Sequence, residues 1–142
     1  MPRLSLAQAT AIIDAAFAKG AELGLKALTV VVLDPGGHMV AAQRQDGASN
    51  MRVKLAAGKA GGALALGVSS RKIGEMAVER PHFVASLHGM AEGGLVPVAG
   101  GVIVAGSDGA ILGAVGVTGD SSDNDEACAL AGIAAAGLQA LG

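Results

Sequence analysis

A glycine-rich strand that leads straight into a helix constrains this chain more than any other segment. Glycine recurs at every third position of residues 113–119, and an acidic stretch, residues 120–126, precedes an apolar helix from Ala127. Glycines in a strand allow another backbone to approach closely. The free N–H groups and the dipole of a helix N-terminus favour anionic partners. The segment therefore predicts an α/β protein with a small-ligand site at this strand–helix junction.

Composition narrows the choice of fold and partner. The 142 residues are 51% hydrophobic, yet they include only two aromatic residues, both Phe, and 23 glycines. We expect one domain, residues 1–142, with a core of Ala, Val, Leu and Ile. The net charge of −2 and the lack of a basic run argue against a nucleic-acid partner. No apolar run is long enough for a membrane span, and the lone Cys128 fits a cytoplasmic location.

Periodicity and turn residues predict the order helix, hairpin, helices, hairpin, helix. The first helix is capped by Ser5 and Gln8 and ends near Gly20 or Gly24, and strands follow at 28–33 and 38–45. A second helix runs from a Ser49 or Asn50 cap to about Leu66, and a third from Ser69 or Ser70 to just before Pro81. We then expect a helical turn or two within 83–90, strands at 96–105 and 110–118, and a last helix over about 123–141. Because each hairpin requires antiparallel pairing, a Rossmann-type chain is excluded.

The acidic residues of the last helix have two interpretations. They can cap the helix, as Ser122 with Asp125 or as Asp123 with Glu126, and oppose its positive dipole end. Alternatively, one of them binds a reactive ligand or a hard cation. Because no histidine lies close by in the sequence, no metal site is predicted.

Two positively charged side chains, Arg44 and Lys59, each have a structural and a ligand-binding interpretation. Arg44 shares a strand face with Val40 and Ala42, where it either snorkels or pairs with Asp46, or else clamps a carboxylate with its planar guanidinium. Lys59 is the only charged residue between Lys54 and Arg71. If its helix face is buried, Lys59 must reach a carboxylate or a ligand and its pKa can fall. If that face is exposed, Lys59 is an ordinary solvated side chain.

The chain has three histidines, His38, His82 and His88, and five methionines that could ligate haem iron. Each histidine could equally be a surface residue. No Cys-x-x-Cys-His motif is present for covalent attachment of haem, and no two histidines have zincin spacing. Cys128, near the start of the last helix, is either a thiol with a lowered pKa or a small buried hydrophobe.

Several segments together resemble the GlcG/HbpS family, which also includes the C-terminal domain of PduO. They are Asp34–Ala41, Arg44–Ala48, Lys59 with Ala60, Val96–Gly101, and Gly113–Asp120 with Asp123–Glu126. The resemblance implies an α/β (α+β) fold, a profilin-like three-layer α/β/α arrangement around a five-stranded antiparallel sheet, assembled as a homo-oligomer. Because the pattern alone predicts four strands, we expect the fifth from a division of residues 96–105 at Gly100.

The resemblance also implies a small-ligand-binding protein. Activities known in the family include haem binding or degradation, association with the cobalamin pathway, and hydroxylaminobenzoate lyase chemistry, and membership does not choose among them. A small aromatic or carboxylated metabolite is the expected ligand. Haem, held by His38, His82 or His88, is the alternative, and a non-catalytic accessory oligomer is the third hypothesis.

We expect the pocket between the end of the first hairpin and the final strand–helix junction. Arg44 would hold a carboxylate, and Asp46 or Glu126 would act as acid or base. The other ligand-binding candidates are Lys59, Thr118, Gly119 and Asp125.

Overall fold

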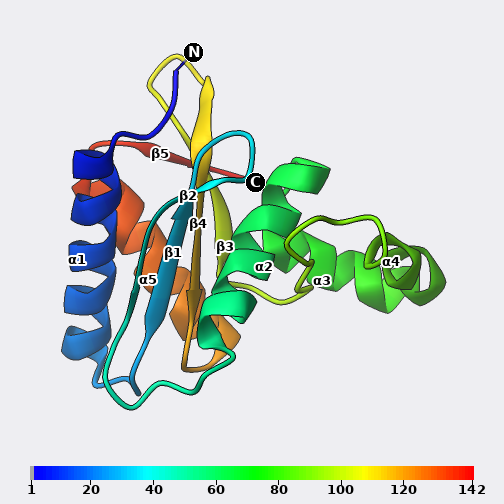
Figure 1. Ribbon diagram of the computed structural model, residues 1–142, viewed down its shortest axis with the longest axis horizontal. Coiled ribbons are helices and arrows are strands. Elements are labelled where there is room, and N and C mark those ends of the chain that lie inside the picture. Colours follow the sequence, from blue (N-terminus) through cyan, green and yellow to red (C-terminus); the bar gives the residue numbers. More distant parts are fainter. Residues whose placement is uncertain (1) are drawn as a thin grey trace.

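The computed structural model describes residues 2–142 and has one antiparallel sheet between two layers of helices (Figure 1). Its elements are α1 (Leu6–Leu23), β1 (Thr29–Leu33), β2 (Met39–Arg44), α2 (Arg52–Leu66), α3 (Ser70–Glu79), α4 (Pro81–Leu87), β3 (Gly101–Ala105), β4 (Ile111–Thr118), α5 (Ser122–Ala135) and β5 (Gln139–Leu141). The strand order is β2-β1-β4-β3-β5, and every neighbouring pair is antiparallel. The predicted five-stranded antiparallel α/β fold is thus confirmed.

The two faces of the sheet carry different layers. Helices α1 and α5 pack on one face and form the larger core with Val30, Val32 and Val115. Helix α2 packs on the other face against Val31 and Ala114. All five residues of β1 are buried, as expected for a largely apolar and β-branched strand covered on both faces. Helices α3 and α4 project beyond the sheet on the α2 side (Figure 1).

Glycine lets α2 approach the sheet closely. A Cβ at Gly116 of β4 would collide with the Ala56 carbonyl, and a Cβ at Gly101 of β3 would collide with the Lys59 carbonyl. The three glycines of α2 lower its helix propensity, and this close packing compensates. None of the helices in residues 2–142 combines the length and hydropathy needed to cross a membrane.

The prediction was wrong for the end of the chain. Helix α5 stops at Ala135 instead of continuing to residue 141, because Gly137 adopts a left-handed φ of 73° and its N–H donates to the Ala134 carbonyl. Residues 139–141 then form β5, which pairs with β3 at the sheet edge. The fifth strand therefore comes from the C-terminus, and residues 96–99 lie outside any strand.

The helix starts were predicted with mixed success. The Ser5–Gln8 capping box, the Gly24 C-cap and the Ser69 N-cap are all present. Helix α2, by contrast, starts at Arg52 without a side-chain cap, so neither Ser49 nor Asn50 caps it. The N-cap of α5 is Ser121, whose hydroxyl accepts the Asn124 N–H. The two predicted N-caps of α5, Ser122 and Asp123, thus lie one and two residues after the observed N-cap.

Candidate functional site

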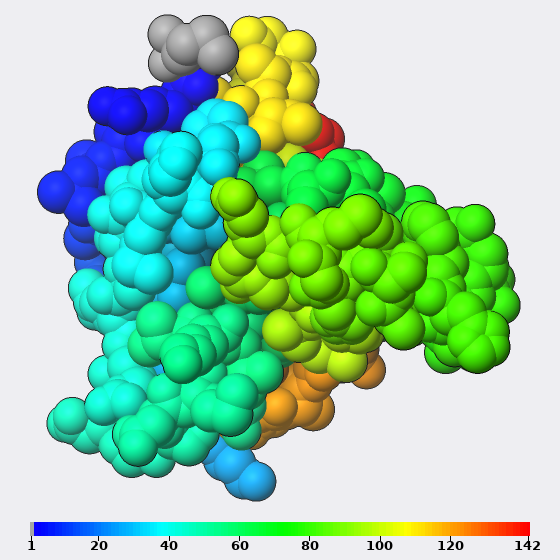
Figure 2. Space-filling view, turned by 45° about the vertical axis from the view of Figure 1, so that its right-hand side comes forward, coloured from blue at the N-terminus to red at the C-terminus, as the bar shows by residue number. Residues whose placement is uncertain are grey.

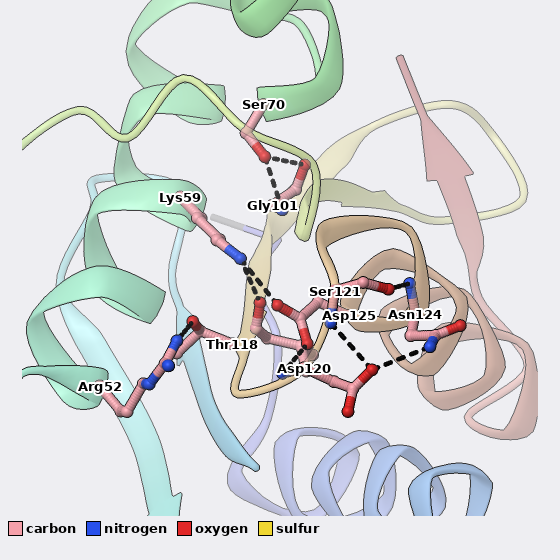
Figure 3. A network of polar contacts seen from close by, with 10 residues as sticks. Arg52, Lys59, Ser70, Gly101, Thr118, Asp120, Ser121, Asn124 and Asp125 are labelled. Carbon is pink, nitrogen blue, oxygen red and sulfur yellow. Dashed lines mark hydrogen bonds and ion pairs between the residues drawn. The ribbon is translucent and has the colours of Figure 1, made fainter. Parts of the chain in front are cut away.

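A buried ion pair joins α2 to α5 at the end of the sheet (Figure 3). Lys59 Nζ donates to Asp125 Oδ2 and to the Val117 carbonyl, each at 3.0 Å. Lys59 is only 3% exposed and Asp125 only 1%. Gly100 leaves room for the lysine, since a Cβ there would lie 2.9 Å from Nζ. Of the two interpretations of Lys59, the buried one that reaches a carboxylate is therefore correct.

Burial dominates the electrostatics of this pair. It lowers the pKa of Lys59, and the charge and hydrogen bond of Asp125 oppose that shift. Burial also raises the pKa of Asp125, against hydrogen bonds from Asp120 N–H and from Lys59. The pair joins α2 to α5 inside the protein, and neither side chain lines any of the pockets described below.

Asp120, in the turn from β4 into α5, accepts most of its hydrogen bonds from the residues that follow it (Figure 3). The Asp120 carboxylate accepts from Lys26 N–H at 3.2 Å and from Ser121 N–H and Asn124 Nδ2 at 2.9 Å each. The hydrogen bonds from Asn124 and Ser121 are the main reason that the pKa of Asp120 lies below its usual value. Gly119 has a φ of 146°, and a Cβ there would collide with the Ala27 carbonyl. The stretch thus shapes the turn from β4 into α5.

Metal-ligating side chains do not gather in this stretch or elsewhere in the part of the chain that the structure describes. Within residues 2–142, no group of three or more His, Cys, Asp or Glu side chains is placed to hold a metal ion. Cys128 is buried, and desolvation by burial raises the pKa of its thiol. Of its two interpretations, the small buried hydrophobe is the correct one.

Glu126 belongs to a different contact. Arg71 of α3 donates through Nε to both Glu126 oxygens, at 3.0 and 3.1 Å, and through Nη2 to Asp123. These hydrogen bonds, the one to Asp123 first, raise the pKa of Arg71. Glu126 also borders a small pocket of about 260 Å³ next to β5. Through its hydrogen bonds with Arg71, Glu126 connects α5 to α3.

Arg44 and Asp46 line an open pocket of about 590 Å³ beside α1. Both residues are exposed, and no ion pair joins them among the described residues. Arg44 Nη1 instead donates to Asn50 Oδ1 at 3.4 Å. The lining of this pocket does not include Lys59, Thr118, Asp125 or Glu126. The structure therefore separates Arg44 and Asp46 from the Lys59–Asp125 pair and from Glu126.

Sequence reasoning overlooked Arg52, the first residue of α2. Its Nη1 donates to Thr118 Oγ1 at 2.9 Å, across 66 positions of the chain. A cation in the first turn of a helix is opposed by the helix dipole. That conflict was the one signal in the sequence that could have singled out Arg52.

A large, mainly apolar concave surface lies where the β1–β2 hairpin, α2 and the segment before β3 meet (Figure 2). Two adjoining pockets, of about 590 and 420 Å³, share Met39, Ala57 and Gly93. We call them together the Met–His groove. Its remaining methionines and histidines are Met51, Met90, His38 and His88. His82 lies exposed on α4 and lines neither pocket.

The family model described as haem degrading protein HbpS-like matches residues 4–134. The chain belongs to the HbpS-like family. No curated protein matches it. Among solved structures, PduOC in complex with haem shares 23% identity and a TM-score of 0.86, covering 99% of both chains. A double mutant of HbpS from Streptomyces reticuli shares 28% identity and a TM-score of 0.80, covering 94% of this chain and 87% of that one.

A third solved structure, the Klebsiella pneumoniae protein ORFY, shares 23% identity and a TM-score of 0.85, covering 96% of this chain and 92% of that one. These neighbours agree with the layered α/β fold described above. At identities below 25%, the likeness to PduOC and ORFY establishes the fold alone.

Proposed function

We propose that this HbpS-like protein binds haem in the Met–His groove. The observation that carries the proposal is a large, mainly apolar surface with imidazole and thioether groups at its border. Met39, Met51 and Met90 are all more than half exposed. An exposed apolar patch of this kind marks a binding site. The HbpS-like family and the haem complex of PduOC support the same ligand.

The side chains of the groove suit the chemistry of haem. Imidazole nitrogen and thioether sulfur are both axial ligands of haem iron. The side chain of His88 has no hydrogen bond among the described residues. His38 Nδ1 lies 3.3 Å from Asp34 Oδ1, which leaves Nε2 for a metal in the arrangement typical of ligating histidines. Haem, when bound, supplies redox-active iron.

Lys54 provides charge at the rim of the groove. It is exposed and lines the larger of the two pockets. An ammonium at the edge of an apolar pocket can pair with a propionate while the macrocycle packs against the methionines. The three methionines adapt to a flat ligand because their side chains are flexible and polarisable.

Haem titration followed by Soret absorbance tests the proposal. We expect a sharp band that saturates at one haem per chain. His88→Ala or His38→Ala should shift the band and weaken binding. His82→Ala is the matched control, since it removes an exposed histidine outside the groove, and should behave like the unmodified protein. A broad band that does not saturate, or one unchanged by all three substitutions, would contradict the proposal and favour a non-catalytic accessory role.

A second candidate function rests on the pocket that Arg44 and Asp46 share. A lyase that acts on a small aromatic carboxylate, as in hydroxylaminobenzoate chemistry, needs a carboxylate clamp and an acid or base within one pocket. Arg44 and Asp46 both border this pocket, whereas Glu126 pairs with Arg71 elsewhere. Asp46→Asn should spare substrate binding and lower turnover. Turnover equal to that of the unmodified protein would remove Asp46 from the reaction.

A further inference from the structure

A row of polar side chains crosses the sheet beside the first turn of α2. Thr29 of β1 pairs directly with Arg44 of β2 on one side and with Thr118 of β4 on the other. Directly paired residues project from the same face of a sheet. This face is the one that packs against α2, because Val31, two residues beyond Thr29, lies in the α2 core. Arg52 completes the cluster through its hydrogen bond to Thr118.

The cluster holds two guanidinium groups, one from β2 and one from α2. Neither Arg44 nor Arg52 forms an ion pair with any acidic group in residues 2–142. Arg44 reaches only the neutral amide of Asn50, and Arg52 only the neutral hydroxyl of Thr118. They lie beside the N-terminus of α2, whose N-cap residue, Met51, makes no side-chain cap bond. A negatively charged group is therefore the partner that this end of the sheet lacks.

Thr29 supplies an independent sign of a missing ligand. It is 0% exposed, and its Oγ1 is the one buried side-chain oxygen or nitrogen in the described chain with no hydrogen-bond partner. A buried hydroxyl without a partner is unfavourable and rare. By strand register, Thr29 lies between Arg44 and Thr118. An oxygen atom of a bound anion would satisfy it.

We propose that Arg44, Arg52, Thr29 and Thr118 form a binding site for a small oxyanion, a carboxylate or a phosphate group. The exposed Arg44 and half-buried Arg52 form its entrance, and the two buried threonines form its floor. Guanidinium groups bind such anions through paired, charge-assisted hydrogen bonds. The uncapped N–H groups of α2 add a favourable electrostatic field. None of these four residues lines the Met–His groove, so this site is separate from the proposed haem site, although it shares Arg44 with the pocket of the second candidate function.

Calorimetric titration with inorganic phosphate and, separately, with benzoate tests the site and distinguishes the two anion classes. At low ionic strength we expect saturable binding of at least one of them to one site per chain. Arg44→Gln and Arg52→Gln should each weaken that binding about tenfold, as expected for a lost charged hydrogen bond. Arg80→Gln is the matched control, because Arg80 stacks on Phe83 on another part of the surface and the change in charge is the same.

Thr29→Val provides a second test, in which a loss of anion binding cannot be attributed to unfolding of the variant. Valine has nearly the shape of threonine but no hydroxyl. Because Thr29 Oγ1 has no partner in the free protein, the variant should melt at the same temperature or higher. Its anion affinity should nevertheless fall about tenfold. Unchanged haem titration of Arg52→Gln would show that the two sites are independent.

Three results would overturn the proposal. The first is no saturable binding of either anion. The second is an equal loss of affinity in Arg80→Gln and Arg52→Gln, which would indicate general charge screening. The third is a Thr29→Val protein that binds the anion as tightly as the unmodified one.

Discussion

The buried Lys59–Asp125 pair allows a quantitative prediction about stability. Asp125→Ala removes the carboxylate that Lys59 Nζ contacts at 3.0 Å and leaves the ammonium with only the Val117 carbonyl. Removing one member of a buried ion pair costs about 3–5 kcal/mol, because the remaining charge stays buried and uncompensated. Both side chains are at least nine-tenths buried, so the full range applies. We expect Asp125→Ala to lower the free energy of unfolding by about 3–5 kcal/mol.

Asp125→Asn separates charge from shape. The amide oxygen can still accept the Asp120 N–H that Asp125 Oδ1 now accepts at 2.9 Å. Lys59 nevertheless loses its counter-charge. The variant should therefore lie between the unmodified protein and Asp125→Ala in stability.

Circular dichroism during urea and thermal unfolding is the appropriate assay, because the chain has no Trp for fluorescence. For domains of about this size, each kcal/mol changes the melting temperature by roughly 2–4 °C. Asp125→Ala should therefore melt on the order of 10 °C lower. The unfolding slope in urea should stay unchanged if only stability is affected.

Removing both charges should reverse much of the loss. In the double variant Lys59→Met with Asp125→Ala, no unpaired charge remains buried, and the methionine fills most of the space of the lysine stem. We expect it to be clearly more stable than Asp125→Ala alone. The reasoning is refuted if Asp125→Ala costs less than about 1 kcal/mol, the value of a surface pair. It is also refuted if the double variant is no more stable than the single one.

Three further predictions concern the surface and the assembly. Arg71→Gln should cost only about 0.5–1 kcal/mol, since its contacts with Glu126 and Asp123 are largely exposed, and 1 M salt should shrink the difference. The folded pKa of Asp120 is lowered from 3.8, so its contribution to stability is present above that pH and is lost as the pH falls below it. The stability of Asp120→Asn should therefore fall less steeply in acid, and an identical acid profile would contradict this. We propose a homo-oligomer, because Leu6 and Val78 leave large apolar side chains exposed outside the Met–His groove. Light scattering at micromolar concentration should give a dimer or larger, and a monomer would contradict the proposal.

The sequence by itself determined the features that depend on neighbouring residues. The Ser5–Gln8 capping box and the Ser69 cap need only contacts three residues apart, so their pattern is visible in the chain. The buried character of β1 follows from its apolar run Val30–Leu33. The resemblance to the GlcG/HbpS family supplied the sheet size, and the family model confirmed the assignment.

Only the tertiary structure decided how α5 ends. The small apolar residues continue through the C-terminus, so their pattern does not distinguish a helix from an edge strand. The left-handed Gly137 turns the chain, and the backbone of β3 is available to pair with residues 139–141. Strand pairing depends on a free edge elsewhere in the fold, which no local pattern can express.

The same limit applies to the candidate sites. Lys59 meets Asp125 across 66 positions of the chain, and Glu126 meets Arg71 across 55. Whether a charged side chain is paired, buried or free depends on which helix covers which face of the sheet. Sequence reasoning could therefore select Arg44 and Lys59 as important but could not tell that they lie in different places. The orphan hydroxyl of Thr29 became visible only once three strands and α2 had been brought together around it.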